Sequence, residues 1–516
     1  MHGLEKLLAL FVAAVMLAAA ARRVGAPYPV FLALGGALLA FVPAGPSFTL
    51  PPDLALALFV APVLLDAAYD TSLRDLRDNW LPLTALVVVA VGLTTAAVAV
   101  VTHALMPAMP WAAAVALGAI VAPPDAVAAT AVLRPLHPPH RILAILEGES
   151  LLNDATSLLI YRLAIGAVAA DGFSPAAVAP TFLLAVVGGM AAGLVFGWAT
   201  LRLMERIDHI PTAIILQFVC TFGVWIVAEK LGLSAVLTLV CYALTMAQTA
   251  PARVPARTRV STNVVWRTVV FALNLLAFIF IGLQIRPILD ATAASDRVPY
   301  IAVGAAVLAT VIAVRIGWIM SFNAVMRWRD RNVDLNPERP LLRPSIGTGL
   351  VVSWAGMRGI VTLAAALALP ASFPYRGLIV ITAAAVVLGT LVIQGLTLEP
   401  LLRKLALSDD DPVGREERFA RAHALKAALD TVTHEFSPAA EMVRQKFTAL
   451  LRFELESSGA ETNGGMVSRD LHSAALHAAR DAVLAMRARK EIGDDAFHRI
   501  EEQLDWIEMA NGQFKD

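Results

Sequence analysis

Two aspartates within long apolar stretches, Asp125 and Asp154, are the residues of this 516-residue chain best placed for chemistry. Asp154 lies about 13 residues after Arg141, or roughly 20 Å along a helix. Asp125 lies about nine residues from the corresponding end of the preceding predicted helix. The two carboxylates are therefore expected at similar depth on adjacent helices. Ionisable side chains at such depth in a membrane are costly and usually serve a function.

Oxygen atoms around these carboxylates predict a site for a small cation. Ser150 lies four residues before Asp154, so the two share one helix face. Asp125 follows two prolines, which break the helix, and the broken backbone at residues 122–124 supplies carbonyls without helical partners. Without a cation, a buried carboxylate favours its protonated form, because burial disfavours charge. Cation and proton would then exclude each other, which is the minimum chemistry of exchange. The alternative for Asp154 is a hydrogen-bonded structural acid.

Two of the predicted membrane helices are interrupted. Residues 121–127 include the Pro123-Pro124 pair. Residues 354–359 include two glycines, Gly356 and Gly359, on either side of Arg358. Irregular backbone inside a membrane is tolerated where it is buried in protein or lines a cavity. Broken helices of opposite direction, one in each half, match the inverted-repeat plan of transporters, in which the substrate site lies where they meet. A kink without function is the alternative for each break.

Other charged residues within apolar stretches have separate expected roles. Glu149 and Arg315 lie at equal depth on their helices, which predicts an ion pair that holds the helices together. Arg358, at the second interruption, is expected to offset the opposing dipoles of the half-helices or to shape the local electric field. Asp66, near the end of the third predicted helix, could line the path of the ion or be an ordinary helix-end acid.

The composition is that of a membrane protein. Hydrophobic residues make up 58% of the chain and charged residues 16%, against about 25% charge in an average soluble chain. The net charge is zero, which predicts no nucleic-acid partner. A membrane helix needs about 20 apolar residues. The sequence predicts thirteen such helices, near residues 4–21, 27–43, 50–69, 80–105, 110–134, 141–169, 177–204, 211–229, 233–248, 264–285, 299–325, 347–370 and 376–402.

The distribution of arginine predicts the orientation. Alternate loops on one side hold 16 cationic residues, and those on the other side hold 4. The rich set is Arg22, Arg23, Arg74, Arg77, Arg134, Arg141, Arg202, Arg206, Arg253, Arg257, Arg259, Arg327, Arg329, Arg331, Arg339 and Arg343; the poor set is Lys230, Arg286, Arg297 and Arg376. The positive-inside rule places the rich set in the cytoplasm. The N-terminus is then outside and the C-terminus is cytoplasmic.

The chain divides into a transmembrane domain, residues 1–407, and a polar tail, residues 408–516. Residues 415–430 and 474–490 have helical spacing, and residues 457–465 resemble a loop. The tail is expected to be a cytoplasmic helical region, either a regulatory or dimerising domain or a partly ordered extension. The first apolar segment is followed by Arg22 and Arg23, which is opposite to a secretory signal and favours an uncleaved helix.

The residues Glu-Gly-Glu-Ser-Leu-Leu-Asn-Asp at 147–154 closely resemble the signature of the monovalent cation:proton antiporter-1 family, the bacterial and eukaryotic sodium/proton exchangers. Residues 124–128, 280–284 and 356–359 and Arg315 support the resemblance, which spans roughly residues 5–405. It implies an all-α membrane protein with about 13 transmembrane helices, inverted repeats and two crossing broken helices. It also implies a plasma-membrane homodimer whose core domain moves against a dimerisation domain, with no cofactor.

The resemblance also implies roles for individual residues. The ion-binding aspartates of the family fall on Asp125 and Asp154, the serine ligand on Ser150, and the structural ion pair on Glu149 and Arg315. A third-helix acid falls on Asp66, which is usually Glu in relatives. Pro124 stands where the family often has Thr, so only its carbonyl could be a ligand. Asn153, beside Asp154, is the family's mark of electroneutral exchange of one cation for one proton.

Several alternatives remain open from the sequence. Carboxylates and carbonyls bind Na+, Li+ and K+, so a K+/H+ antiporter of the same fold is an alternative. A cation channel would need a pore-loop signature, and none is visible. An intramembrane aspartyl protease could use two aspartates that share a proton. Tyr69-Asp70 faintly matches half of that enzyme's signature, but the Gly-x-Gly-Asp half is absent. The sequence therefore favours a transporter, not an enzyme.

Overall fold

The computed structural model describes residues 2–42, 51–169, 183–207, 209–332, 345–405, 407, 412–434 and 436–457, with a few single positions between 478 and 500. All secondary structure in these residues is helical. The chain forms two compact units, Met1–Asp410 and Asp411–Asp516. The all-α fold class predicted from the sequence is confirmed for the described residues.

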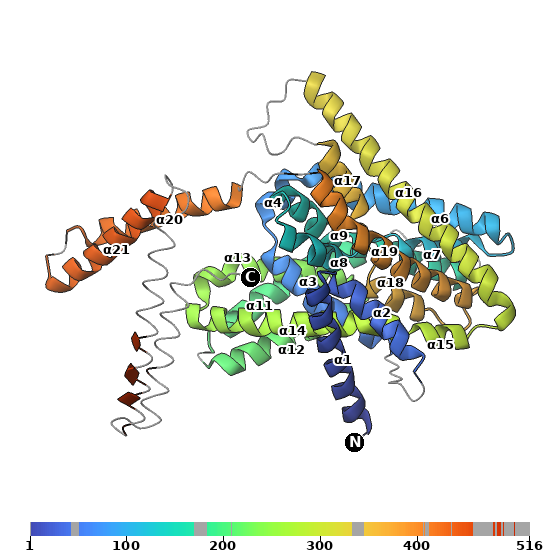
Figure 1. Ribbon diagram of the computed structural model, residues 1–516, viewed down its shortest axis with the longest axis horizontal. Helices are drawn as coiled ribbons and strands as arrows, with labels where there is room; N and C mark the ends of the chain where they lie inside the picture. Colours follow the sequence, from blue (N-terminus) through green and yellow to red (C-terminus); the bar gives the residue numbers. More distant parts are fainter. Residues whose placement is uncertain are drawn as a thin grey trace. The chain divides into compact units, whose positions relative to one another are not determined.

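The first unit contains helices that follow the apolar stretches of the sequence (Figure 1). Its first half comprises α1 (His2–Val24), α2 (Tyr28–Ala40), α3 (Pro52–Asp70), α4 (Leu73–Asp78), α5 (Trp80–Thr84), η1 (Ala85–Ala90), α6 (Val91–Leu105), α7 (Trp111–Val121), α8 (Ala126–Leu133), η2 (Arg134–Leu136) and α9 (His140–Ala169). Its second half comprises η3 (Leu184–Gly188), α11 (Gly189–Met204), α12 (Ile210–Lys230), α13 (Ala235–Arg253), α14 (Ala256–Leu283), α15 (Ile285–Asp290), α16 (Ala294–Asn332), α17 (Ile346–Trp354), α18 (Ile360–Leu367) and α19 (Arg376–Leu405).

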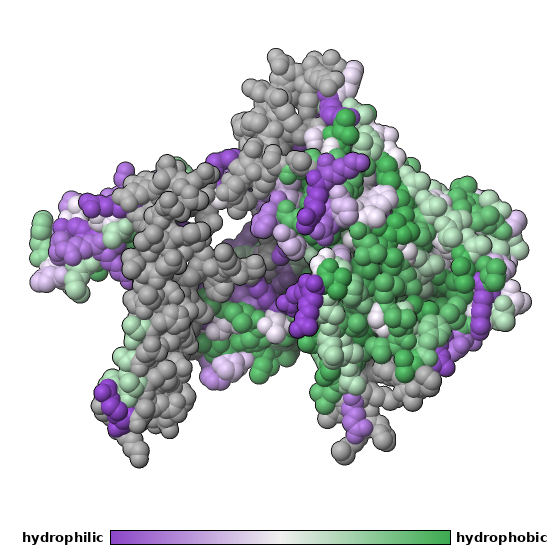
Figure 2. Space-filling model, viewed as in Figure 1, coloured by the Kyte–Doolittle hydropathy of each residue, from purple (hydrophilic) through white to green (hydrophobic). Residues whose placement is uncertain are grey.

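Within the described residues, nine helices are long and apolar enough to cross a membrane. Three shorter apolar helices, Tyr28–Ala40, Leu54–Tyr69 and Ala235–Ala250, coincide with further predicted spans, and the remaining predicted span, 347–370, corresponds to the α17–α18 pair. Apolar surface covers much of the visible face of this unit (Figure 2). A multi-pass membrane protein is therefore confirmed, whereas the count of thirteen and the orientation stay predictions.

Several helices extend beyond the predicted apolar spans. Helix α14 begins at Ala256, eight residues before the span predicted to start at 264, and α16 continues to Asn332, beyond 325. Both extensions are rich in arginine and other polar residues. Hydropathy reports only the apolar part of a helix, whereas the backbone hydrogen bonds continue into the polar segment. The first residues of the predicted span 177–204 lie outside the described residues.

Both predicted helix interruptions are present. Helices α7 and α8 are separated at Ala122–Asp125, and α17 and α18 are separated at Ala355–Gly359. The chain runs through each gap as irregular backbone before helix resumes. The sequence therefore predicted the positions of the breaks correctly, because prolines and glycines act locally on the backbone.

Close helix crossings in this unit depend on glycines. A Cβ added at Gly36 of α2 would collide with the carbonyl oxygen of Ile279 in α14, and one added at Gly282 would collide with that of Ala33. Gly118 of α7 lies equally close to the carbonyl of Thr95 in α6. Small residues let membrane helices approach closely where the hydrophobic effect gives little drive for association.

The second unit contains α20 (Pro412–Val432) and α21 (Pro438–Ser457). Helix α20 covers the predicted helical stretch 415–430. Most of the second predicted stretch, 474–490, lies outside the described residues, as does the predicted loop after Ser457. The role of the tail and the boundary at residue 407 stay predictions.

We predict that Gly36→Ala destabilises the α2–α14 crossing by about 1–3 kcal/mol, the usual cost of overpacking. Gly92→Ala in α6 is the matched control, because a Cβ there would meet nothing within 4 Å. Alanine favours the helix over glycine by roughly 0.5–1 kcal/mol, so this control should be as stable as the native protein or more so. Thermal unfolding of both purified variants in detergent would measure the difference; equal midpoints would contradict the close crossing.

Candidate functional site

The first interruption presents Asp125 at the start of α8. Its Oδ1 accepts a hydrogen bond from the backbone N–H of Val127 at 2.9 Å, so the side chain caps the helix. The backbone N–H of Ala126, the residue directly after Asp125, donates to the Oγ of Ser150 at 3.3 Å. Helix N-termini carry partial positive charge, which stabilises a carboxylate. Asp125 is therefore held in place by α8, and Ser150 is held beside it.

Polar side chains on one face of α9 donate hydrogen bonds to both broken helices. Asn153 donates through Nδ2 to the carbonyl of Pro124 at 2.9 Å. Ser157 donates to the carbonyl of Ala119 in α7 at 2.6 Å, and Tyr161 donates to that of Ala365 in α18 at 3.0 Å. Sequence reasoning missed Ser157 and Tyr161, although their spacing from Ser150 and Asn153 places all four on one helix face.

Arg358, at the second interruption, is buried and reaches across to the first. Its Nε donates to the carbonyl of Val121 at 3.0 Å, its Nη2 donates to that of Ala122 at 3.2 Å, and its Nη1 donates to that of Gly356. Val121 is the last residue of α7, whose C-terminal carbonyls carry partial negative charge. The guanidinium thus lies at the C-terminal end of a half-helix.

The two breaks are in direct contact. The backbone N–H of Asp125 donates to the carbonyl of Met357 at 2.6 Å, and that of Arg358 donates to the Oγ1 of Thr390 in α19 at 3.0 Å. A Cβ added at Gly359 would overlap Oδ2 of Asp125, so this position admits only glycine while the carboxylate is there. The arrangement matches the crossing of broken helices that the sequence predicted.

The carbonyls at the first break have side-chain partners. Sequence reasoning expected the oxygens of residues 122–124 to be available to a cation, but those of Ala122 and Pro124 accept hydrogen bonds from Arg358 and Asn153. The reason is physical: a buried carbonyl without a partner is costly, so nearby donors occupy it. A carbonyl has two lone pairs, and each can still accept a second interaction. Oδ1 of Asn153 is buried without a hydrogen-bond partner among the described residues.

Glu149 and Arg315 form a buried, bidentate ion pair. Nη1 and Nη2 of Arg315 lie 2.6 and 2.8 Å from the two carboxylate oxygens of Glu149, and the exposed fractions of the residues are 3% and 1%. Arg315 also donates to the carbonyls of Ser353 at 3.2 Å and Val352 at 3.1 Å. A Cβ at Gly356 would collide with the Arg315 side chain. One guanidinium therefore links α9, α16 and α17.

Asp125, Ser150 and Asp154 line one cavity. Its wall is completed by apolar residues of α3 and α18, and by Asn274 of α14. Asp154 is 7% exposed, and no hydrogen bond to its carboxylate is present within the described part of the chain. Sequence reasoning missed Asn274, a single amide in an apolar helix. Pro124 lines the same cavity, whereas Asp66 lines a different one.

Sodium, lithium and potassium prefer oxygen ligands, and this cavity offers two carboxylates, the hydroxyls of Ser150 and Thr362, and an amide. The cavity lies between two apolar clusters: one contains much of α7, α8 and α16–α19, and the other contains much of α3 and α11–α13. A site where two broken helices cross is typical of the class of secondary transporters.

Comparison with known proteins identifies the family. Residues 8–404 match the family described as "Sodium/hydrogen exchanger, transmembrane". The chain therefore belongs to the sodium/hydrogen exchanger family, a family of membrane antiporters. An uncharacterized Na+/H+ exchanger of Mycobacterium tuberculosis is 31% identical, over 98% of this chain and 96% of its own length.

Further relatives agree with this assignment. The sodium, potassium, lithium and rubidium/H+ antiporter of Bacillus subtilis is 28% identical, over 94% of this chain and 74% of its own length. The solved structure of the sodium proton antiporter MjNhaP1 from Methanocaldococcus jannaschii covers 78% of this chain and 99% of its own, with a TM-score of 0.57 and 15% identity. This likeness shows a shared fold.

We predict that Arg315→Ala costs about 3–5 kcal/mol of stability, because it leaves the Glu149 carboxylate buried and unpaired. The double variant Glu149→Leu/Arg315→Leu should recover much of the loss, because an apolar pair needs no compensating charge. Thermal unfolding and size-exclusion chromatography would measure both. Arg202→Ala is the control, because the Arg202 side chain is 59% exposed and its contact with Glu205 is 3.8 Å long. A folded, fully stable Arg315→Ala protein would contradict the structural role.

Proposed function

We propose that this protein exchanges Na+ for H+ across the plasma membrane, with cation and proton competing for Asp154 and Asp125. The observation that carries the proposal is the shared cavity of Asp125, Ser150 and Asp154 at the contact of the two broken helices. Membership of the exchanger family supports it. The names of relatives support antiport of monovalent cations.

The two aspartates have unequal roles in this proposal. Asp125 accepts a hydrogen bond at the N-terminus of α8, which keeps its carboxylate in place as a cation ligand. Asp154 is more deeply buried and has no comparable donor among the described residues. A buried carboxylate without a cation or a donor favours the protonated form. Asp154 therefore carries cation and proton in turn, and Ser150 completes the ligand set.

We propose alternating access of the site, and its position between the two apolar clusters supports this. Movement of the cluster that holds α7, α8, α17 and α18 against the cluster that holds α3 and α11–α13 would expose the cavity to one side at a time. We further propose a homodimer, a cytoplasmic C-terminus and an external N-terminus. The 16-to-4 distribution of cationic residues supports the orientation.

A K+/H+ antiporter is the second candidate. The B. subtilis relative is named for sodium, potassium, lithium and rubidium, so a site of this family is compatible with larger cations. An enzyme or channel has less support. The Asp125 carboxylate is held by the N-terminus of α8, whereas an aspartyl protease needs two carboxyls that share one proton.

We predict that Asp154→Asn abolishes cation-dependent proton flux, because an amide cannot exchange a proton for a cation. The purified protein would be reconstituted in liposomes, and proton movement would be followed after addition of Na+, Li+ or K+. The variant should give the rate of protein-free liposomes. Asp290→Asn is the matched control, because that side chain is 67% exposed. Native flux in Asp154→Asn would overturn the mechanism, and flux with K+ alone would select the second candidate.

Exchange is predicted to be electroneutral, because one exchangeable carboxylate takes either one cation or one proton. In the same liposomes, a K+ gradient with valinomycin would set the membrane potential while Na+ drives proton movement. The rate should be the same at zero and at large potential for a fixed pH gradient. A strong dependence on potential would show that charge moves in each cycle and would contradict the one-to-one count.

A further inference from the structure

A second polar cavity lies in the first unit, apart from the cavity of Asp125 and Asp154. It is lined by residues of α3, α11, α12, α13 and α14. The lining comes from the C-terminal parts of α3, α11 and α13 and from the N-terminal parts of α12 and α14. These are the helix ends that the arginine distribution assigns to the cytoplasm.

Four side chains that line this cavity each have a buried polar atom without a hydrogen-bond partner in the described part of the chain. They are Oε1 of Gln217, Nε of Arg259, Oγ1 of Thr262 and Nε1 of Trp266. Gln217, Thr262 and Trp266 are each at most 6% exposed. Buried polar atoms are nearly always paired, and each unpaired one is costly. Four such atoms around one cavity indicate a polar occupant.

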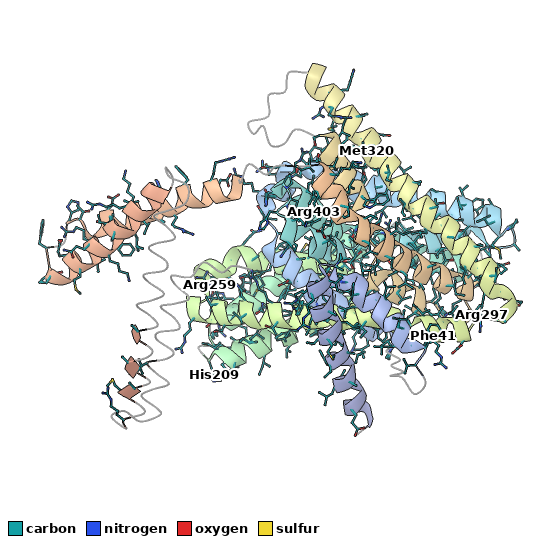
Figure 3. The ribbon with its side chains drawn as sticks, viewed as in Figure 1. Phe41, His209, Arg259, Arg297, Met320 and Arg403 are labelled. Carbon is teal, nitrogen blue, oxygen red and sulfur yellow. The ribbon has the colours of Figure 1, made fainter. Side chains whose placement is uncertain are left out.

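The donors lie along one face of α14. Arg259, Thr262 and Trp266 are spaced by three and four residues, which places them in a row toward the helix N-terminus. Figure 3 labels Arg259 at this end of α14. The Trp266 ring stacks on Phe218 with centroids 4.2 Å apart, so the indole is held in one orientation. The row combines a guanidinium, a hydroxyl and an indole N–H.

The charge of the cavity favours an anion. Arg259 and Arg267 contribute two positive charges and Asp66 one negative charge, which leaves a net charge of 2 − 1 = +1. The amide of Gln217 can present its NH2 group instead of its oxygen after a half-turn. We propose that this cavity binds a phosphate group, with the Nε of Arg259, the hydroxyl of Thr262 and the indole N–H of Trp266 as donors. Arginine is the preferred side chain for phosphate recognition.

Such a site would act on the neighbouring ion cavity through α3. Leu65, Asp66 and Tyr69 line the phosphate cavity, whereas Val63 and Leu64 line the cavity of Asp125 and Asp154. An anion beside Asp66 would make the local potential more negative and raise the local concentration of cations. Occupancy is therefore expected to lower the cation concentration that half-saturates transport. The phosphate site itself does not depend on the proposed exchange function.

Binding of inorganic phosphate to the detergent-purified full chain tests the proposal. Isothermal titration at constant ionic strength, with chloride as the replaced anion, should give saturable binding. Arg259→Gln should weaken it about tenfold or more, because it removes a charge-assisted hydrogen bond. Thr262→Val and Trp266→Phe should each weaken it about threefold to tenfold, and Trp266→Phe keeps the aromatic stack. Arg206→Gln, an exposed arginine outside the cavity lining, should leave binding unchanged.

A second arm distinguishes a free phosphate from a lipid headgroup. Native mass spectrometry of the protein from nanodiscs of phosphatidylglycerol and of phosphatidylcholine would count retained lipids. Retention of one lipid that Arg259→Gln and Trp266→Phe lose, without binding of inorganic phosphate, would assign the site to a lipid phosphate. Saturable binding of inorganic phosphate would assign it to a soluble anion. Binding of neither, or equal binding by the Arg259, Thr262 and Trp266 variants, would overturn the proposal.

Discussion

Interrupted helices inside a membrane create backbone groups that water cannot reach, and each of these groups needs a partner. The crossing of α7–α8 with α17–α18 meets this requirement with groups from the opposite break. Arg358 binds the carbonyls of Val121 and Ala122, and the carbonyl of Met357 receives the N–H of Asp125. Each break is thus completed by the other. The two interruptions therefore form one structural unit, although more than 200 residues separate them in the chain.

Helix α9 provides the second support of this crossing. Ser150, Asn153, Ser157 and Tyr161 bond to α8, the first break, α7 and α18, respectively. Glu149, on a neighbouring face, binds Arg315 and through it the carbonyls of α17. Asp154 lies among these residues with no hydrogen bond in the described structure. The neighbouring side chains are held by hydrogen bonds, whereas the Asp154 carboxylate is left available. Such a carboxylate can bind a cation and a proton in turn.

The sequence predicted local features well, because their causes are local. Two consecutive prolines and a pair of glycines indicated the breaks, and hydropathy indicated the spans. Equal depth on two helices was enough to suggest that Glu149 and Arg315 meet, and the structure brings them together. The partners of Arg358 could not be inferred, because they depend on how two distant segments cross. Asn274 gave no signal either, since one amide in an apolar helix carries no pattern.

Asp66 shows why depth alone does not define a site. Its position near the end of α3 suggested a place on the path of the ion, yet it lines a different cavity from Val63 and Leu64, three and two residues away. A helix turns by about 100° per residue, so neighbours in sequence face different surroundings. The side of α3 toward the broken helices presents apolar residues, and the side toward the N-terminal part of α14 presents a carboxylate in a cavity that two arginines also line. Helix α3 is therefore shared by two polar cavities, and a charge that enters one of them changes the electric field in the other.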